Sequence, residues 1–187
     1  MSTAGLVIVV VAVVILVVAA VLVLRPKLRS RRLRDRFGPE YDRAINKADH
    51  RRSGERELIT REHRHAELDL RDLSTEQKQR YRVQWAGVQE EFVDNPVDAM
   101  SAADRLVTTI MADRGYPTES YDQQLADLSI EHAAALDHYR AAHYVATRTK
   151  GAEVSTEEMR AAIVHYRKLF QDLLDGDIPD QKKDALS

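Results

Sequence analysis

The chain of 187 residues is long enough for one domain and an additional segment. It contains no cysteine, which excludes disulfides, thiolate metal ligands and a cysteine nucleophile. The net charge of −2 conceals a segregation of charge: residues 1–24 carry no charged side chain, residues 25–36 carry seven basic and one acidic residue, and the remaining 21 basic and 29 acidic residues follow them.

Residues 4–24, AGLVIVVVAVVILVVAAVLVL, contain no polar side chain and predict a transmembrane helix. A helix of this length rises about 31 Å, close to the hydrocarbon thickness of a bilayer. A buried core helix would normally have a polar face, and a signal peptide would have basic residues before a shorter apolar run. Neither pattern is present, so the stretch is interpreted as a retained transmembrane helix. Residues 1–3 before it are expected to form a short extracytoplasmic N-terminus.

A basic collar follows at residues 25–36. Its basic side chains are Arg25, Lys27, Arg29, Arg31, Arg32, Arg34 and Arg36. Basic residues beside a span tend to stay in the cytoplasm, which predicts a single-pass protein of the plasma (inner) membrane with its N-terminus outside and its C-terminal domain cytoplasmic. An exported domain in the opposite orientation is the alternative topology.

The same collar is expected to contact anionic lipid headgroups, each basic side chain contributing about 1 kcal/mol. Nucleic acid is not an expected partner, because the collar would be tied to the membrane and the rest of the chain is acidic.

Residues 37–67 predict a polar helical arm. Gly38 and Pro39 are expected to break any helix that continues from the collar, and Pro39 suits the first turn of the next helix. Apolar residues are too sparse beyond this point for a coiled coil, which favours a spacer or a weak self-association surface. Three histidines in this region, His50, His63 and His65, are expected on a solvated face.

Residues 68–176 predict a bundle of about four amphipathic helices. Ser74 and Ser155 open the capping boxes Ser-x-x-Gln and Ser-x-x-Glu, and Pro96 suits the first turn of a helix. A further helix is expected to start at Ser129 and to end before Gly151.

A short helix is also possible within 118–128, whereas the polar tail at 177–187 has no apolar period and is expected to be disordered. The fold class is therefore all-α, with a transmembrane helix, a polar membrane-proximal arm and a helical bundle.

The tripeptide His-Tyr-Arg occurs twice, at 138–140 and 165–167, which raises the question of a catalytic or metal site. Helical spacing places both tyrosines on core faces, and His143 takes the repeat position that Phe170 takes in the other copy. This comparison favours His143 as a half-buried, hydrogen-bonded packing residue. The candidates for a polar site are His132, His138, His143 and His165.

Two histidine ligands on one helix normally lie three or four residues apart, but His132, His138 and His143 are spaced six and five apart. No metal and no other cofactor is therefore expected. Neither Gly-x-Ser-x-Gly nor a glycine-rich phosphate loop occurs, so no catalytic residue is assigned. A Ser-His-acid triad remains open, because such triads are assembled in space.

Several phrases occur together in order: RFGPEYDRA at 36–44, QWAGVQEEFVDNP at 84–96, DRGYP at 113–117, ADLSIEH at 126–132 and HYRKLFQDLL at 165–174. In these phrases the chain resembles a family of uncharacterised single-pass membrane proteins common in actinobacteria. The resemblance covers roughly residues 30–175 and implies the layout of anchor, collar and helical domain. It implies no activity, ligand or catalytic residue.

The sequence thus favours a membrane-anchored cytoplasmic helical scaffold or adapter, without catalysis, that binds a protein partner at the inner membrane face. Weak self-association is the other form of contact expected. The alternative is a small membrane-tethered enzyme or ligand-binding domain that uses histidines of the 130–170 region.

Overall fold

A computed structural model describes residues 3–149 and 154–176, and all of the described secondary structure is α-helical. The chain divides into two compact units, Met1–Leu58 and Ile59–Ser187, called here the N-terminal and C-terminal units. The predicted disordered tail at 177–187 lies outside the described residues, as do the first two residues of the predicted extracytoplasmic segment.

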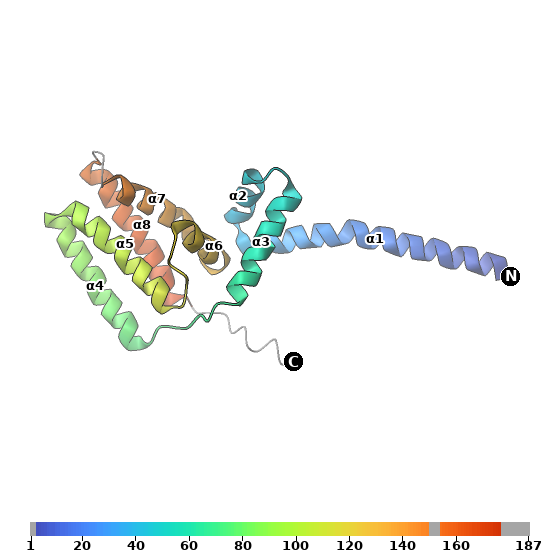
Figure 1. The fold of residues 1–187 in the computed structure, drawn as a ribbon, viewed down its shortest axis with the longest axis horizontal. Coiled ribbons are helices and arrows are strands. Elements are labelled where there is room, and N and C mark those ends of the chain that lie inside the picture. The colour runs from blue at the N-terminus through green and yellow to red at the C-terminus, as the bar shows by residue number, and fades with distance from the viewer. Residues whose placement is uncertain (1–2, 150–153, 177–187) are drawn as a thin grey trace. The chain divides into compact units, whose positions relative to one another are not determined.

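Helix α1 of the N-terminal unit, Thr3–Phe37, runs without interruption from the apolar stretch through the whole basic collar (Figure 1). The apolar stretch is therefore not a helix of its own. Within it, the side chains described are those of residues 12–16 and of Leu24.

None of the helices, as far as their residues are described, combines the length and apolarity needed to cross a membrane. This finding contradicts the predicted transmembrane helix at 4–24. With it falls the predicted single-pass placement in the plasma membrane with the N-terminus outside.

Gly38 separates the first two helices as the sequence predicted. Its φ of +49° is a left-handed conformation that glycine adopts without strain, and it ends α1 at Phe37. Pro39 then opens helix α2, Pro39–Lys47, at a position where its missing N–H costs nothing.

The predicted arm is two helices, because the chain turns at residues 48–50 between α2 and helix α3, Arg51–Ala66. Gly54 of α3 lies so close to α2 that a Cβ there would be 2.8 Å from the carbonyl oxygen of Ala44. No apolar period in the local sequence reveals this packing of α3 on α2 within the N-terminal unit.

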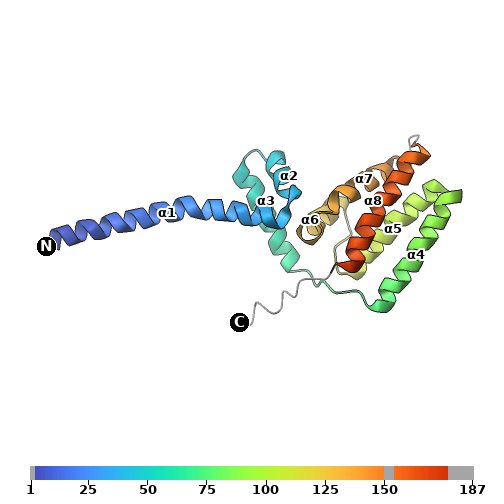
Figure 2. The ribbon, with the colours of Figure 1, turned by 180° about the vertical axis from the view of Figure 1, so that it is seen from behind.

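The C-terminal unit contains helices α4 Thr75–Asp94, α5 Pro96–Asp113, α6 Tyr121–Glu131, α7 Leu136–Arg148 and α8 Thr156–Asp175. Helix α4 packs on α5, and α8 packs on both α5 and α7 (Figures 1 and 2). Both predicted capping boxes are present, at Ser74 and at Ser155. The predicted helix starts at Pro96 and within 118–128 are present as well.

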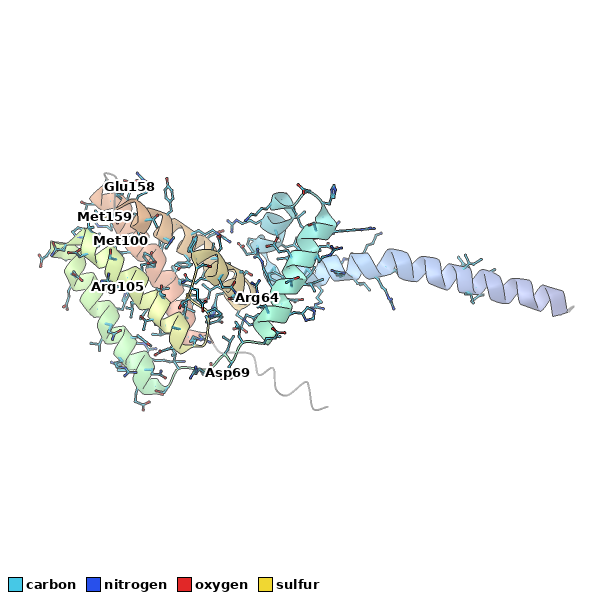
Figure 3. The ribbon with its side chains drawn as sticks, in the orientation of Figure 1. Arg64, Asp69, Met100, Arg105, Glu158 and Met159 are labelled. Carbon is cyan, nitrogen blue, oxygen red and sulfur yellow. The ribbon has the colours of Figure 1, made fainter. Side chains whose placement is uncertain are left out.

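The core of this unit forms from the predicted apolar faces. Trp85 of α4 stacks on Phe170 of α8, with ring centroids 4.8 Å apart. Met100 of α5 and Met159 of α8 lie in the same buried cluster, and Figure 3 shows them at one end of the bundle.

The expected helix from Ser129 to residue 150 is wrong. Helix α6 continues through Ser129 to Glu131, and α7 starts only at Leu136. Ser129 is fully buried and donates to the carbonyl oxygen of Ala126 at 2.5 Å, so it caps no helix. The break between α6 and α7 follows His132, whose ring is hydrogen-bonded to Tyr116 and Asp172.

Gly115, which follows the C-cap residue Arg114 of α5, is a position where only glycine fits. Its φ is +92°, and a Cβ there would overlap with the carbonyl oxygen of Asp69 (Asp69 is labelled in Figure 3). The segment that contains Asp69 is also held by the Arg71 N–H, which donates to the carbonyl oxygen of Arg114 at 3.0 Å.

We expect Gly115→Ala to destabilise the C-terminal unit by about 2 kcal/mol or more, because it adds both φ strain and an overlap with backbone. Gly87→Ala is the matched control, since Gly87 lies in helix α4 with nothing within 4 Å of its Cβ position. That change should stabilise the helix by about 1 kcal/mol.

Urea unfolding followed by fluorescence measures both effects, because the single tryptophan, Trp85, lies in this core. An unchanged midpoint for Gly115→Ala would contradict the close approach to Asp69.

Candidate functional site

The four predicted histidines belong to three separate polar groupings in the C-terminal unit. His132 lies in a buried network at the ends of α5, α6 and α8. His143 joins an aspartate of α5, while His138 and His165 contact each other. They therefore do not converge on one site.

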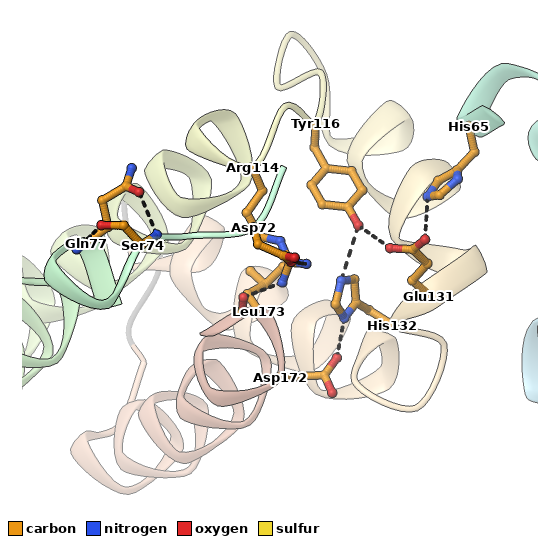
Figure 4. Close-up of polar contacts among 10 residues, drawn as sticks. All are labelled: His65, Asp72, Ser74, Gln77, Arg114, Tyr116, Glu131, His132, Asp172 and Leu173. Carbon is orange, nitrogen blue, oxygen red and sulfur yellow. Dashed lines mark hydrogen bonds and ion pairs between the residues drawn. The ribbon is translucent and has the colours of Figure 1, made fainter. Parts of the chain in front are cut away.

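His132 is the C-cap of α6 and is 4 % exposed. Its Nδ1 lies 2.6 Å from Asp172 Oδ2, and its Nε2 lies 3.3 Å from the Tyr116 hydroxyl (Figure 4). Tyr116 in turn donates to Glu131 Oε2 at 3.0 Å. The result is a chain of carboxylate, imidazole, phenol and carboxylate.

Tyr116 acts in this chain as a hydrogen-bond donor. Burial, and then the charge of Glu131, raises the pKa of its phenol far above the usual range. The hydroxyl therefore keeps its proton at physiological pH, and a phenolate nucleophile is not available here.

His65 extends the network and corrects the expectation of a solvated histidine. It is 2 % exposed, and its Nε2 lies 3.7 Å from Glu131 Oε1 (Figure 4). The other two histidines of the arm, His50 and His63, are exposed as predicted.

Arg114 is the buried charge that sequence reasoning missed. It caps α5, is 1 % exposed, and its Nη1 donates to the carbonyl oxygen of Leu173 at 2.5 Å (Figure 4). That carbonyl lies in the last turn of α8, where it has no helical partner and where the helix dipole favours a cation. Asp72, 3.8 Å from Nη2, compensates the charge.

One signal in the sequence could have found Arg114. It stands four residues after Ile110 and so continues the apolar stripe of α5. A charged residue on an apolar stripe indicates a buried ion that needs partners.

His143 forms the centre of the second grouping. Its Nδ1 is 3.2 Å from Asp104 Oδ1, and the same oxygen accepts from the Tyr166 hydroxyl at 2.7 Å. The Tyr121 ring stacks on the imidazole at 4.0 Å with an interplanar angle of 12°. The imidazole is 23 % exposed, so His143 is the half-buried, hydrogen-bonded residue that the sequence predicted.

His138 and His165 pair across α7 and α8. Their Nδ1 atoms are 2.8 Å apart and their rings stack at 5.0 Å. One nitrogen must donate and the other accept, so at least one of the two rings is a neutral imidazole. Burial, and then the charge of His138, lowers the pKa of His165.

The described residues contain no group of three or more His, Cys, Asp or Glu side chains placed to hold a metal ion. The polar groupings instead join helices. Asp172, Arg114 and Tyr116 connect three helix ends, and Asp104 connects α5 to α7 and α8.

Comparisons of the chain with protein-family models, with curated proteins and with solved structures give no match. The resemblance noted in the sequence therefore stays a prediction, and the functional argument depends on the residues themselves.

The pH dependence of stability should reveal the His138–His165 pair. The lowered pKa of His165 means that the unfolded chain binds its proton first, near the ordinary value of 6.5. The stability that the neutral His165 contributes is therefore fully present above pH 6.5. It is lost as the pH falls from 6.5 to the lower pKa of His165 in the folded protein.

We expect the melting temperature to fall between about pH 7.5 and about pH 5.5, and His165→Phe should reduce this fall. His63→Phe is the control, because His63 is exposed. Equal pH profiles for the wild type and His165→Phe would refute this assignment.

The packing role of His143 predicts that His143→Phe changes the free energy of unfolding by less than about 1 kcal/mol, because the stack on Tyr121 persists. Asp104→Ala should cost about 1–3 kcal/mol, since the buried Tyr166 hydroxyl loses its acceptor. Chemical denaturation compares the two, and a larger loss for His143→Phe would overturn the packing role.

Proposed function

We propose that this chain is a non-enzymatic helical scaffold or adapter whose C-terminal unit binds an amphipathic helix of a protein partner. The observation that carries the proposal is the α4 outer face, on the side of α4 opposite its buried stripe. The face consists of Glu76, Gln79, Arg80, Val83, Gln84 and Gly87.

Helix α4 carries two exposed apolar side chains, Val83 and Val93, among polar residues where no partner within the chain covers it. Its inner stripe, with Tyr81, Trp85 and Val88, is buried in the core. On the opposite side Val83 is 62 % exposed, and a shallow hollow of about 550 Å³ lies along the first half of the helix. An apolar hollow with a polar rim is the usual form of a helix-binding surface.

Gly87 strengthens this interpretation. It follows Val83 by one helical turn on the outer face, where glycine costs about 1 kcal/mol of helix stability relative to alanine. No atom lies within 4 Å of its Cβ position, so packing within the chain does not require glycine. A residue without a side chain lets the backbone of a second helix approach closely.

The charges near the C-terminal end of α4 suggest the chemistry of the partner. Glu90, Glu91 and Asp94 are all exposed there. A partner helix with an apolar ridge and basic residues at one end would complement this face, and opposite charges raise the rate and the specificity of association.

The histidine alternative has less support from the geometry. His132 is buried inside the bundle, and the His138–His165 pair lies in a different contact from that of His143 with Asp104. The Nδ1 atoms of His138, His143 and His165 all have partners within the chain.

The test is co-purification with the tagged full chain and its variants. We expect Val83→Asp and Gly87→Leu to weaken partner recovery at least about tenfold, because each blocks the contact face. Val164→Asp is the control, since Val164 is also an exposed apolar residue but lies on α8.

Gly87→Ala separates binding from folding. It should raise the stability of the helix and still weaken partner binding, a combination that loss of folding cannot produce. If the recovered partner is a second copy of the chain, size measurements should show Val83→Asp to be monomeric. Equal recovery by the wild type, Val83→Asp and Gly87→Leu would sink the proposal.

A further inference from the structure

The N-terminal unit contains a pocket lined almost entirely by arginines. Helix α1 supplies Arg25, Arg29 and Arg32, and α3 supplies Arg52, Glu55 and Arg56, around a cavity of about 570 Å³. The α1 residues are spaced by four and three positions, and the α3 residues by three and one, so each set lies on one face of its helix. We call this cavity the α1–α3 arginine pocket.

The pocket has a net charge of +4, from five guanidinium groups and one carboxylate. Glu55 is also engaged elsewhere: its Oε1 accepts from Ser30 Oγ at 2.6 Å, Tyr41 hydroxyl at 2.9 Å and Arg51 Nε at 3.0 Å. Arg51 does not line the pocket, yet it donates to Glu55, the only carboxylate in the pocket lining. The lining therefore contains more positive than negative side chains.

Glu55 stays ionised in this position. Burial by itself raises the pKa of the carboxyl, but the hydrogen bonds from Ser30, Tyr41 and Arg51 together hold it below its ordinary value. The Glu55 carboxylate thus connects α1, α2 and α3 by hydrogen bonds. These bonds hold the helices that carry the pocket arginines in fixed positions.

Like charges held close together repel each other, and they repel more strongly near protein than in bulk water. Such a cluster is stabilised when an anion enters it. Arginine forks suit phosphate oxygens because they donate two parallel hydrogen bonds, and a volume of this size suits a small molecule.

We propose that the α1–α3 arginine pocket binds a ligand that carries a cluster of two or more phosphate groups. The ligand chemistry can come from a free oligophosphate or from a polyphosphorylated lipid headgroup. This site differs from the collar predicted from the sequence, because it selects three of the seven collar residues and adds Arg52 and Arg56 of α3. It is also independent of the α4 outer face.

The remaining collar residues provide a matched control. Lys27 and Arg31 are exposed on α1 but do not line the pocket. Arg34 also lies outside it, 3.4 Å from Asp42 and over the Tyr41 ring. Variants Arg29→Gln/Arg52→Gln and Lys27→Gln/Arg31→Gln remove the same charge, one pair from inside the pocket and one from outside.

The experiment titrates the full chain by calorimetry with inorganic triphosphate and with monophosphate. We expect triphosphate to bind much more tightly than monophosphate, with an affinity that falls as salt rises. Arg29→Gln/Arg52→Gln should weaken binding at least about tenfold and Lys27→Gln/Arg31→Gln less than about threefold. Circular dichroism checks that both variants keep their helix content.

If the glutamine variant loses its fold, Arg29→Lys/Arg52→Lys replaces it, because this variant keeps the positive charge. It should still weaken triphosphate binding several-fold, because lysine cannot donate the two parallel hydrogen bonds of a guanidinium group. A second arm uses vesicles with and without a phosphoinositide bisphosphate. Binding only to those vesicles, dependent on Arg29 and Arg52, supports the proposal with a lipid source, and binding of free triphosphate supports it with a free one. Equal loss in both glutamine variants, or binding to neither probe, overturns it.

Discussion

The hydrogen bond from Arg114 to the carbonyl oxygen of Leu173 holds together the end of the bundle where the polar network lies. A buried guanidinium costs several kcal/mol unless its charge and donors are met. Here the C-terminal carbonyl of α8 accepts, the helix dipole favours the cation, and Asp72 lies nearby. The arrangement therefore requires α5 and α8 to end at the same level.

The residues that follow Arg114 extend this constraint to the other helices. Gly115 allows the chain to reverse against Asp69, and Tyr116 reaches Glu131 and His132 at the end of α6. One turn thus fixes the segment before α4, the end of α5 and the end of α6. A rigid bundle of this kind presents the α4 outer face as a preformed surface, which lowers the entropic cost of binding a partner helix.

The two proposed binding surfaces use different physics. The α4 outer face depends on burial of apolar area in the C-terminal unit, so it should be insensitive to salt at its centre. The α1–α3 arginine pocket depends on charge in the N-terminal unit and should respond strongly to salt. The segregation of charge visible in the composition underlies this difference.

Much of the C-terminal unit could be predicted from the sequence because its signals are local. The capping boxes at Ser74 and Ser155, the proline at Pro96 and the apolar stripes of α4, α5 and α8 are properties of neighbouring residues. The half-buried state of His143 followed from the same periodicity. The break between α6 and α7 could not be predicted, because it depends on the bond from His132 to Asp172, forty positions away.

The sequence by itself determined that the chain is helical, where Gly38 breaks α1, and where the capped helices begin, since these follow from backbone preferences of a few adjacent residues. Only the tertiary structure decided which charges are buried and which meet. It placed His65 and Arg114 in the interior, gathered five arginines of α1 and α3 around one cavity, and contradicted the span expected at 4–24. Pairing between residues distant in the chain depends on how helices pack, and residue spacing along one helix carries no record of it.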